Sequence, residues 1–300
     1  MRKEPRRILL AIRAPLRVSP GILRKVAKLC RSSGARLELF HAAEVSGVEA
    51  LRFIQERLDR IADSPLLRNI RVSARVVEDR PPHEAIVRRA VAARSDLVIA
   101  SAQAAGAGSR WFLRNTDWEL IRYCPCPLLL LKSARPYDKR SILTAVDPFH
   151  ANAKPARLDG ELLTAGAAFA RLLSRPLHVF HAYMPLLTGV QGTLGEAALW
   201  QDPEVERIHT AQVRRAFDRL AERAHIPPSR RHLVMGDIVG ELQATAARVK
   251  AGIAVMGAVS RSGLNRLFIG STAESALDAL TCDVLVIKPR SFEAPAWSRA

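Results

Sequence analysis

A glycine-containing loop near the C-terminus carries the clearest ligand-binding chemistry in this 300-residue chain. An apolar run ends at Gly257, a polar loop follows, and Gly270, Ser271 and Thr272 open a segment with apolar residues at helical spacing. Glycines let backbone amides approach a ligand, and a helix N-terminus offers unpaired N–H groups that suit phosphate. The segment therefore predicts an anion site, and simple helix capping by Ser271 and Thr272 is the alternative interpretation.

Asp147 is the second candidate for ligand chemistry. It follows an apolar run at 141–146, and open α/β sheets bind ligands beyond the carboxyl ends of their strands. A carboxylate in that place could accept hydrogen bonds from a ribose hydroxyl or an adenine amine. A turn aspartate before Pro148 is the alternative.

An internal duplication supplies the elements that must position these residues. Three strand-like segments, at 7–12, 36–42 and 126–132, recur in the same order at 141–146, 176–182 and 282–288. Each half predicts five strands that alternate with helices, which is typical of a parallel sheet with helices on both faces. The expected strands lie near 7–12, 36–42, 70–77, 96–101 and 127–132, and near 141–146, 176–182, 230–235, 252–257 and 283–288. We therefore expect an α/β fold with two domains, 1–135 and 136–300.

The loop spacing resembles the nucleotide loop of the universal stress protein family. That loop runs glycine, two residues, glycine, nine residues, glycine, then serine or threonine. Gly257, Gly270 and Ser271 match it, and Asp147 matches an aspartate that lies near the nucleoside in family members that bind ATP. Ser260 stands where the family has its middle glycine, and a serine can still present its backbone N–H there.

The whole chain is similar to the tandem E-type bacterial universal stress proteins. The resemblance implies two flavodoxin-like, adenine nucleotide hydrolase-like domains, each with a five-stranded parallel sheet, in a cytoplasmic stress-response protein. It further implies ATP, with Mg²⁺ as its companion ion, in the C-terminal domain only. The implied nucleotide-binding residues are Asp147, Gly257, Ser260, Arg261, Gly270, Ser271 and Thr272. Of these, Arg261 could neutralise phosphate charge or could equally be solvated.

The first half lacks the matching parts. Arg13 takes the place of Asp147, and Arg114 stands where the second half has Gly270. We therefore expect no ATP site in residues 1–135, whose loop has lost the motif.

Motifs of other enzymes are absent from the sequence. It contains no G-x-x-x-x-G-K-[ST] loop, no G-x-S-x-G elbow and no H-E-x-x-H helix. Asp147 has no acid or base partner in sequence, so we expect at most slow ATP hydrolysis. His41 and His181, at matching strand ends, are expected to be structural.

The four cysteines lack zinc-ligand spacing and are expected to be reduced thiols. Cys124 and Cys126 lack the C-x-x-C spacing of redox motifs and are too close for an easy disulfide.

The net charge of +17 is concentrated in the first half, where residues 1–136 hold 26 Lys and Arg against 13 Asp and Glu. A positive surface attracts nucleic acid and acidic proteins. This gives the alternative function, a ligand-free interaction scaffold that acts through its basic N-terminal half, while solvated arginine faces are the simpler interpretation of the charge.

Other features of the chain bear on its environment and assembly. No apolar stretch approaches ~20 residues, so no transmembrane segment is expected. Two tandem domains could imitate a dimer within one chain, so a monomer or a homodimer is expected. An extra segment at 185–200 is expected to be a mobile loop, and the tail beyond Lys288 to run irregularly over the surface.

Overall fold

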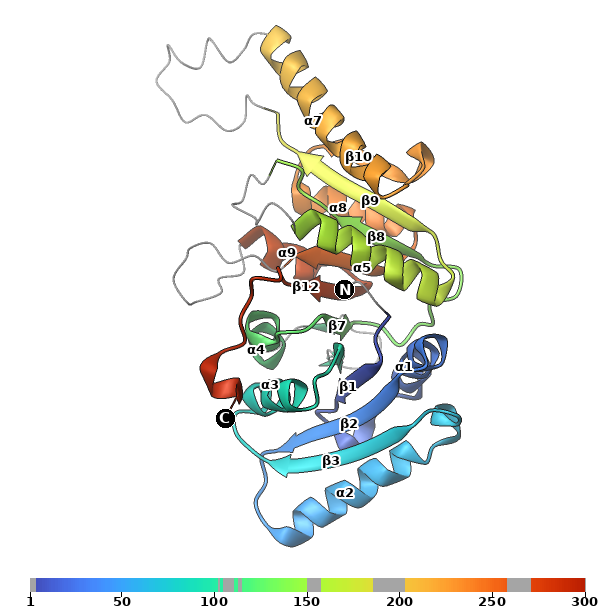
Figure 1. Cartoon of the computed structure of the whole chain (residues 1–300), viewed down its shortest axis with the longest axis vertical. Coiled ribbons are helices and arrows are strands. Elements are labelled where there is room, and N and C mark those ends of the chain that lie inside the picture. The colour runs from blue at the N-terminus through green and yellow to red at the C-terminus, as the bar shows by residue number, and fades with distance from the viewer. Residues whose placement is uncertain are drawn as a thin grey trace.

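Two similar α/β halves lie end to end and share one sheet in the computed structural model of this protein (Figure 1). The structure describes residues 4–101, 103–104, 111–112, 115–149, 158–185, 203–257 and 271–299. Among these residues no helix is both long enough and apolar enough to cross a membrane. The ten strands of the sheet follow the order β10-β9-β8-β11-β12-β7-β4-β1-β2-β3.

The first half is built from five strands that run parallel to one another. They are β1 (Arg7–Ala11), β2 (Arg36–Ala43), β3 (Val72–Glu78), β4 (Leu97–Ser101) and β7 (Leu128–Leu131). Its α-helices are α1 (Pro20–Ser33), α2 (Val48–Ala62), α3 (Pro82–Ala92) and α4 (Asn115–Tyr123). Short 3-10 turns, η1 (Pro15–Arg17) and η2 (Pro65–Leu67), and a small antiparallel pair, β5 (Gln103–Ala104) with β6 (Trp111–Phe112), complete it.

The second half repeats this plan. Its strands are β8 (Ser141–Ala145), β9 (Leu177–Tyr183), β10 (Arg231–Met235), β11 (Ala251–Gly257) and β12 (Asp283–Ile287). Its described α-helices are α5 (Leu158–Leu173), α7 (Pro203–Arg223), α8 (Ile238–Arg248) and α9 (Ser271–Ala279), and η4 (Pro228–Arg230) precedes β10. All ten strands begin and end within two residues of the expected ranges.

The strand order confirms the predicted α/β class and adds two details. Counted within each half, the order is 3-2-1-4-5, which is the order of the first five strands in the dinucleotide-binding fold rather than the 2-1-3-4-5 order of flavodoxin. The fifth strands of the two halves, β7 and β12, pair antiparallel, with Leu129 opposite Leu285. The two parallel sheets therefore join edge to edge, and an approximate twofold axis relates the halves.

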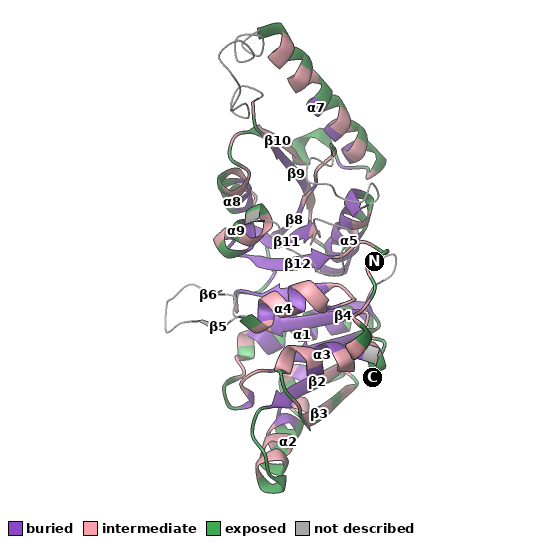
Figure 2. Cartoon of the chain, turned by 90° about the vertical axis from the view of Figure 1, so that its left-hand side faces the viewer, coloured by how far each residue is buried: buried purple, intermediate pink, exposed green. Residues whose placement is uncertain are grey.

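Apolar strands and amphipathic helices account for the layers. The strands nearest the seam between the halves are almost entirely apolar, and Leu128 to Leu131 are at most 1% exposed because helices cover both faces (Figure 2). One buried cluster packs α1, α2 and α5 on one face, and a second packs α3, α4, α8 and α9 on the other. Helix α7 covers the outer end of the first face through Val213 and Phe217.

A buried polar cluster fastens the halves where the linker crosses the seam. Lys25 of α1 forms an ion pair with Asp283 at the start of β12, and both side chains are at most 2% exposed. The Tyr137 hydroxyl donates to Asp283 Oδ2 at 2.6 Å, and the Lys132 backbone N–H donates to Asp283 Oδ1 at 2.9 Å. Burial raises the pKa of Asp283 and lowers that of Lys25, so each charge is tolerated because the other compensates it.

Two lysines cross the seam in opposite directions. Lys132, after β7, donates from Nζ to the carbonyl oxygens of Leu277 and Leu280 at the end of α9, each at 2.5 Å. Lys288, after β12, donates to the Arg122 carbonyl oxygen of α4 at 2.6 Å. Each half therefore supplies the lysine that donates to the last carbonyls of a helix in the other half.

The segment after β12, residues 289–299, is irregular up to Pro295, as expected from the sequence, and ends in a 3-10 turn; we call it the C-terminal strap. It returns to the first half, where η5 (Ala296–Arg299) packs against α3 (Figure 1). Trp297 meets the Tyr123 ring edge-on at a centroid distance of 5.7 Å, and the Arg88 guanidinium lies 5.9 Å from the Trp297 centroid. These ring contacts hold the strap in place because a large aromatic side chain gains free energy from burial.

Candidate functional site

The candidate site lies where the strand order of the second half reverses, between β8 and β11. Open α/β sheets bind ligands at this switch point, beyond the carboxyl ends of the strands. Thr144 of β8 is in register with Val255 of β11, so Asp147 and Gly257 both lie at this edge of the sheet. The structure thus brings together two residues that are 110 positions apart in the sequence.

Asp147 is held by its backbone and leaves a carboxylate oxygen open. Its N–H donates to Oδ1 of Asp159, a buried residue in the first turn of α5, at 3.0 Å. Its Oδ2 is buried and accepts no hydrogen bond from the described residues. A buried acceptor without a donor costs free energy, so this oxygen is suited to a ligand that brings a hydroxyl or amine.

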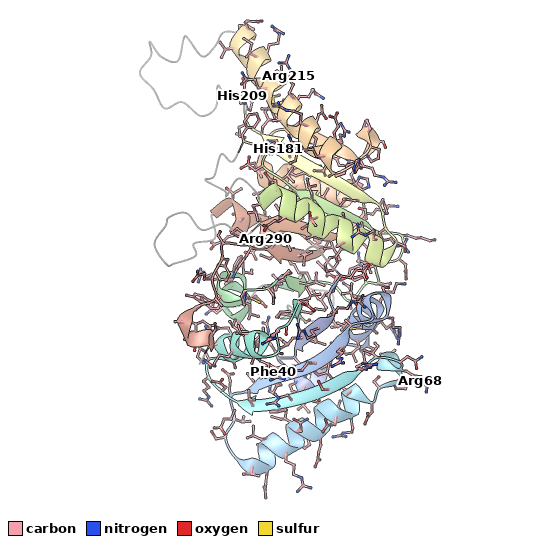
Figure 3. The ribbon with its side chains drawn as sticks, in the orientation of Figure 1. Phe40, Arg68, His181, His209, Arg215 and Arg290 are labelled. Carbon is pink, nitrogen blue, oxygen red and sulfur yellow. The ribbon has the colours of Figure 1, made fainter. Side chains whose placement is uncertain are left out.

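A histidine fixes the turn that carries Asp147. His181 lies on β9 (Figure 3). Its Nδ1 is 3.0 Å from the Val146 carbonyl oxygen, and its ring stacks on Phe217 of α7. The first half repeats the contact, with His41 Nδ1 2.6 Å from the Ile12 carbonyl oxygen. Burial lowers the pKa of His41, which keeps that imidazole neutral. The predicted structural role of these two histidines agrees with these contacts.

Gly257 has a packing role that its place in the loop motif did not reveal. A Cβ at this position would lie 2.9 Å from Leu158 Cδ2, in the first turn of α5, and 3.7 Å from Leu162 Cδ1. The absence of a side chain therefore lets α5 approach the end of β11. Because α5 also carries Asp159, this close approach helps to place the backbone of Asp147.

Helix α9 begins at Ser271, as the sequence predicts, and Thr272 is exposed in its first turn. The N-terminal N–H groups of the helix are the part of the predicted phosphate site that the structure describes. Ser260, Arg261 and Gly270 lie outside the described residues, as does the side chain of Ser271.

The matching place in the first half is filled by the protein itself. Arg13, which stands where the second half has Asp147, forms an ion pair with Asp117 in the first turn of α4. The Asp117 side chain is fully buried and that of Arg13 is 16% exposed. A guanidinium at the switch point and a carboxylate at the helix N-terminus thus pair with each other, where a ligand would otherwise supply the charge.

Sequence reasoning missed Asp117 and Asp159. Both lie in the first turn of a helix, where aspartate is common for capping and dipole reasons, so residue type alone gave no signal. The one available hint was the arginine at the Asp147 position, since a buried arginine requires an anion nearby.

A cavity of about 410 Å³ opens at the opposite edge of the sheet, among the amino ends of β8 and β11. Its lining includes four cationic side chains, Arg135, Lys139, Arg140 and Lys250, and one carboxylate, Asp138. None of the four forms an ion pair with a carboxylate of the described chain. The C-terminal end of α8 also faces this cavity, and cations there offset the helix dipole. Of the residues predicted to bind nucleotide, Asp147, Gly257 and Thr272 do not line it.

The described residues contain no cluster of three or more His, Cys, Asp or Glu that could hold a metal ion.

Known proteins resemble this chain over most of its length. The model of the universal stress protein family matches residues 5–132 and again residues 140–288. Universal stress protein E of Salmonella typhi is 29% identical over 234 residues, which cover 75% of this chain and 70% of that protein. The Escherichia coli (strain K12) protein of the same name is 28% identical over 234 residues, with the same coverage.

Two solved structures share the whole architecture. A functionally unknown protein from Pseudomonas aeruginosa PAO1 has a TM-score of 0.77 and 25% identity, covering 95% of this chain and 93% of its own. A universal stress protein from Archaeoglobus fulgidus has a TM-score of 0.63 at 15% identity, covering 95% and 98%, and supports the fold alone.

Proposed function

Because the chain belongs to the universal stress protein family, which supports a role in the stress response, we propose that its second half binds an adenine nucleotide, ATP, as a switch. The buried Oδ2 of Asp147, which lacks a donor among the described residues, is the observation that carries this proposal. A ribose hydroxyl or the adenine amine would donate to it and remove the free-energy cost of an unsatisfied acceptor.

The other parts of the site have distinct roles in the proposal. The N–H groups at the start of α9 receive the phosphates, where the helix dipole favours negative charge. Ser260, Gly270 and Ser271 contribute backbone or hydroxyl donors, Thr272 lies beside the phosphates, and Arg261 balances their charge. Gly257 keeps α5 close enough for Asp159 to hold the Asp147 backbone. Mg²⁺ enters with the phosphates.

We propose one nucleotide per chain. In the first half, the Arg13–Asp117 ion pair lies where the nucleoside would bind and at the helix N-terminus where the phosphates would bind. A nucleotide there would have to break a pair whose carboxylate is fully buried, which is strongly unfavourable.

Calorimetric titration of nucleotide-stripped protein with ATP and Mg²⁺ tests this proposal. We expect one ATP per chain, and we expect Asp147→Asn to lose most of the affinity. Asp278→Asn is the matched control, because it removes the same charge from an exposed residue of α9 and should leave binding unchanged.

Two results would contradict the site. Binding that survives Asp147→Asn but falls in Lys250→Ala would move the nucleotide to the basic cavity at the opposite edge. No heat and no thermal stabilisation would favour the interaction scaffold, and its basic half could then be tested for a steep loss of nucleic-acid binding between ~50 and ~200 mM salt.

A further inference from the structure

Two cysteines lie together where α4 leads into β7, close to the C-terminal strap. Cys124 Sγ and Cys126 Sγ are 3.6 Å apart, and both are free thiols. Cys124 is fully buried, whereas Cys126 is partly exposed. The two sulfurs therefore touch already, although their spacing in the sequence argued against an easy disulfide, and they need to approach to about 2.05 Å to form a bond.

The contact separates the properties of the two thiols. The hydrogen bond from Cys126 lowers the pKa of Cys124, and the charge of Lys288 acts in the same direction. The same bond, together with burial, raises the pKa of Cys126. The two ionisations are therefore coupled, and a negative charge on one sulfur is stabilised by the hydrogen bond from the other.

Lys288 gives that charge a cation nearby. Its Nζ donates to the Arg122 carbonyl oxygen, two residues before Cys124, and lies 3.9 Å from the centre of the Phe292 ring in the C-terminal strap. Carbonyls at a helix C-terminus oppose a thiolate, and an ammonium group bound to one of them offsets this effect.

The approximate twofold symmetry supplies an internal comparison. The places of Cys124 and Cys126 are taken in the second half by Leu280 and Cys282, beside Lys132. Burial raises the pKa of Cys282 to about 12, and it does the same for Cys30. Both regions therefore have a lysine from the opposite half, Lys288 or Lys132, but two neighbouring cysteines are found in the first half and one in the second.

We propose that Cys124 and Cys126 form an oxidisable dithiol that hydrogen peroxide converts to a disulfide. Cys126, the partly exposed residue of the pair, attacks as it passes its proton to the Cys124 thiolate: an S–O bond forms, the O–O bond breaks, and the departing hydroxide takes a proton and leaves as water. Cys124 then attacks the sulfenic sulfur, so that the S–S bond forms, the S–O bond breaks and a second water leaves. The dithiol loses two electrons and two protons, and the peroxide is reduced to water.

Oxidation of these cysteines should affect the contact that holds the C-terminal strap. Tyr123 precedes Cys124 directly and holds Trp297 edge-on. A bond between the two sulfurs shortens the turn after α4 and shifts the ring on which Trp297 rests. We therefore expect the fluorescence of Trp297 to change on oxidation, measured as the difference between the wild-type protein and Trp297→Phe.

Peroxide titration of the reduced full-length chain tests the proposal without any substitution. After each dose, the remaining thiols are alkylated in denaturant and mapped by mass spectrometry. We expect Cys124 and Cys126 to lose alkylation together, with loss of two hydrogen atoms and recovery by dithiothreitol, at least about tenfold faster than Cys30 and Cys282 react. Equal rates at all four cysteines, or sulfinic acid at Cys126 without a disulfide, would overturn the proposal.

Cysteine variants separate the two steps. Cys124→Ser should leave Cys126 as a sulfenic acid that dimedone captures, and Cys282→Ser, the matched control, should form the disulfide at the wild-type rate. Circular dichroism establishes that each variant is folded. Absence of a dimedone adduct in folded Cys124→Ser would contradict the proposed order of attack.

Discussion

The same position in the two halves carries opposite charges, and the surroundings of each charge differ accordingly. Arg13 in the first half reaches Asp117 and forms an ion pair whose carboxylate is fully buried, whereas Asp147 in the second half keeps a buried oxygen without a donor among the described residues. One switch point therefore holds an ion pair within the chain, and the other is left for a ligand. A duplicated fold can keep its architecture while one copy turns its binding place into a structural contact.

The largest effect should come from breaking the pair in the first half. Arg13→Ala leaves Asp117 buried without its cation, so the free energy of unfolding should fall by about 3 kcal/mol. Urea denaturation measures this loss. The double variant Arg13→Leu/Asp117→Leu removes both charges and should regain most of it; a double variant as unstable as the single one would mean that packing, rather than charge, dominates.

The seam lysines offer the next comparison. Lys132 is 3% exposed and donates to carbonyls at the end of α9, so Lys132→Met leaves those acceptors buried without a donor. We expect a loss of about 2 kcal/mol in the free energy of unfolding. Lys288→Met should cost less, because burial lowers the pKa of Lys288 to about 7 and part of its charge is already absent at neutral pH. Equal losses in the two variants would contradict this difference between the halves.

The outer strands of the halves should respond differently to acid. His178 Nδ1 lies 2.9 Å from His232 Nε2 in the second half, where the first half has Glu38 and Arg75 with 4.0 Å between their charged groups. Burial is the main cause that lowers the pKa of His232 to about 4, and the charges of His178 and Arg248 lower it further.

An unfolded histidine has a pKa near ~6.5, so between pH ~6.5 and ~4 His232 binds a proton in the unfolded chain but not in the folded chain. Stability should therefore fall as the pH drops through this window. His232→Gln should reduce that acid-dependent loss by roughly 1–2 kcal/mol, as measured by urea denaturation at pH 7 and pH 4.5. An unchanged slope against pH would show that other groups cause the loss.

The smallest effect on stability should come from the site itself. Without ligand, Asp147→Asn should leave the free energy of unfolding unchanged or raise it by up to about 1 kcal/mol, because it removes a charge whose Oδ2 lacks a donor. Thermal melts of the wild-type protein and Asp147→Asn, each with and without ATP, measure this effect. A marked loss of stability without ATP would mean that Asp147 is structural, like Arg13.

The sequence predicted the ten strands because most are short apolar runs between turn residues, and the duplication supported the order of three of them in each half. It predicted the start of α9 from Ser271 and the place of Asp147 from the end of an apolar run. The pairing of β7 with β12 could not be predicted, since Leu128 to Leu131 would be equally apolar against any covering element.

Contacts between residues far apart in the chain could not be predicted from the sequence either. Nothing in the residue types links Arg13 to Asp117, which lies 104 positions away, or Trp297 to Tyr123. The packing role of Gly257 could not be predicted, because the sequence does not show whether a glycine makes room for a ligand or for a neighbouring helix.

The antiparallel pairing of β7 with β12 makes an interface that dilution cannot dissociate. Two separate subunits joined in this way would part at low concentration, and any substitution would appear in both at once. In a single chain the contact persists at any concentration, and each half can accumulate changes that the other does not share. A permanent attachment of this kind is what allows a pair as uneven as Arg13 and Asp147 to exist at symmetric positions.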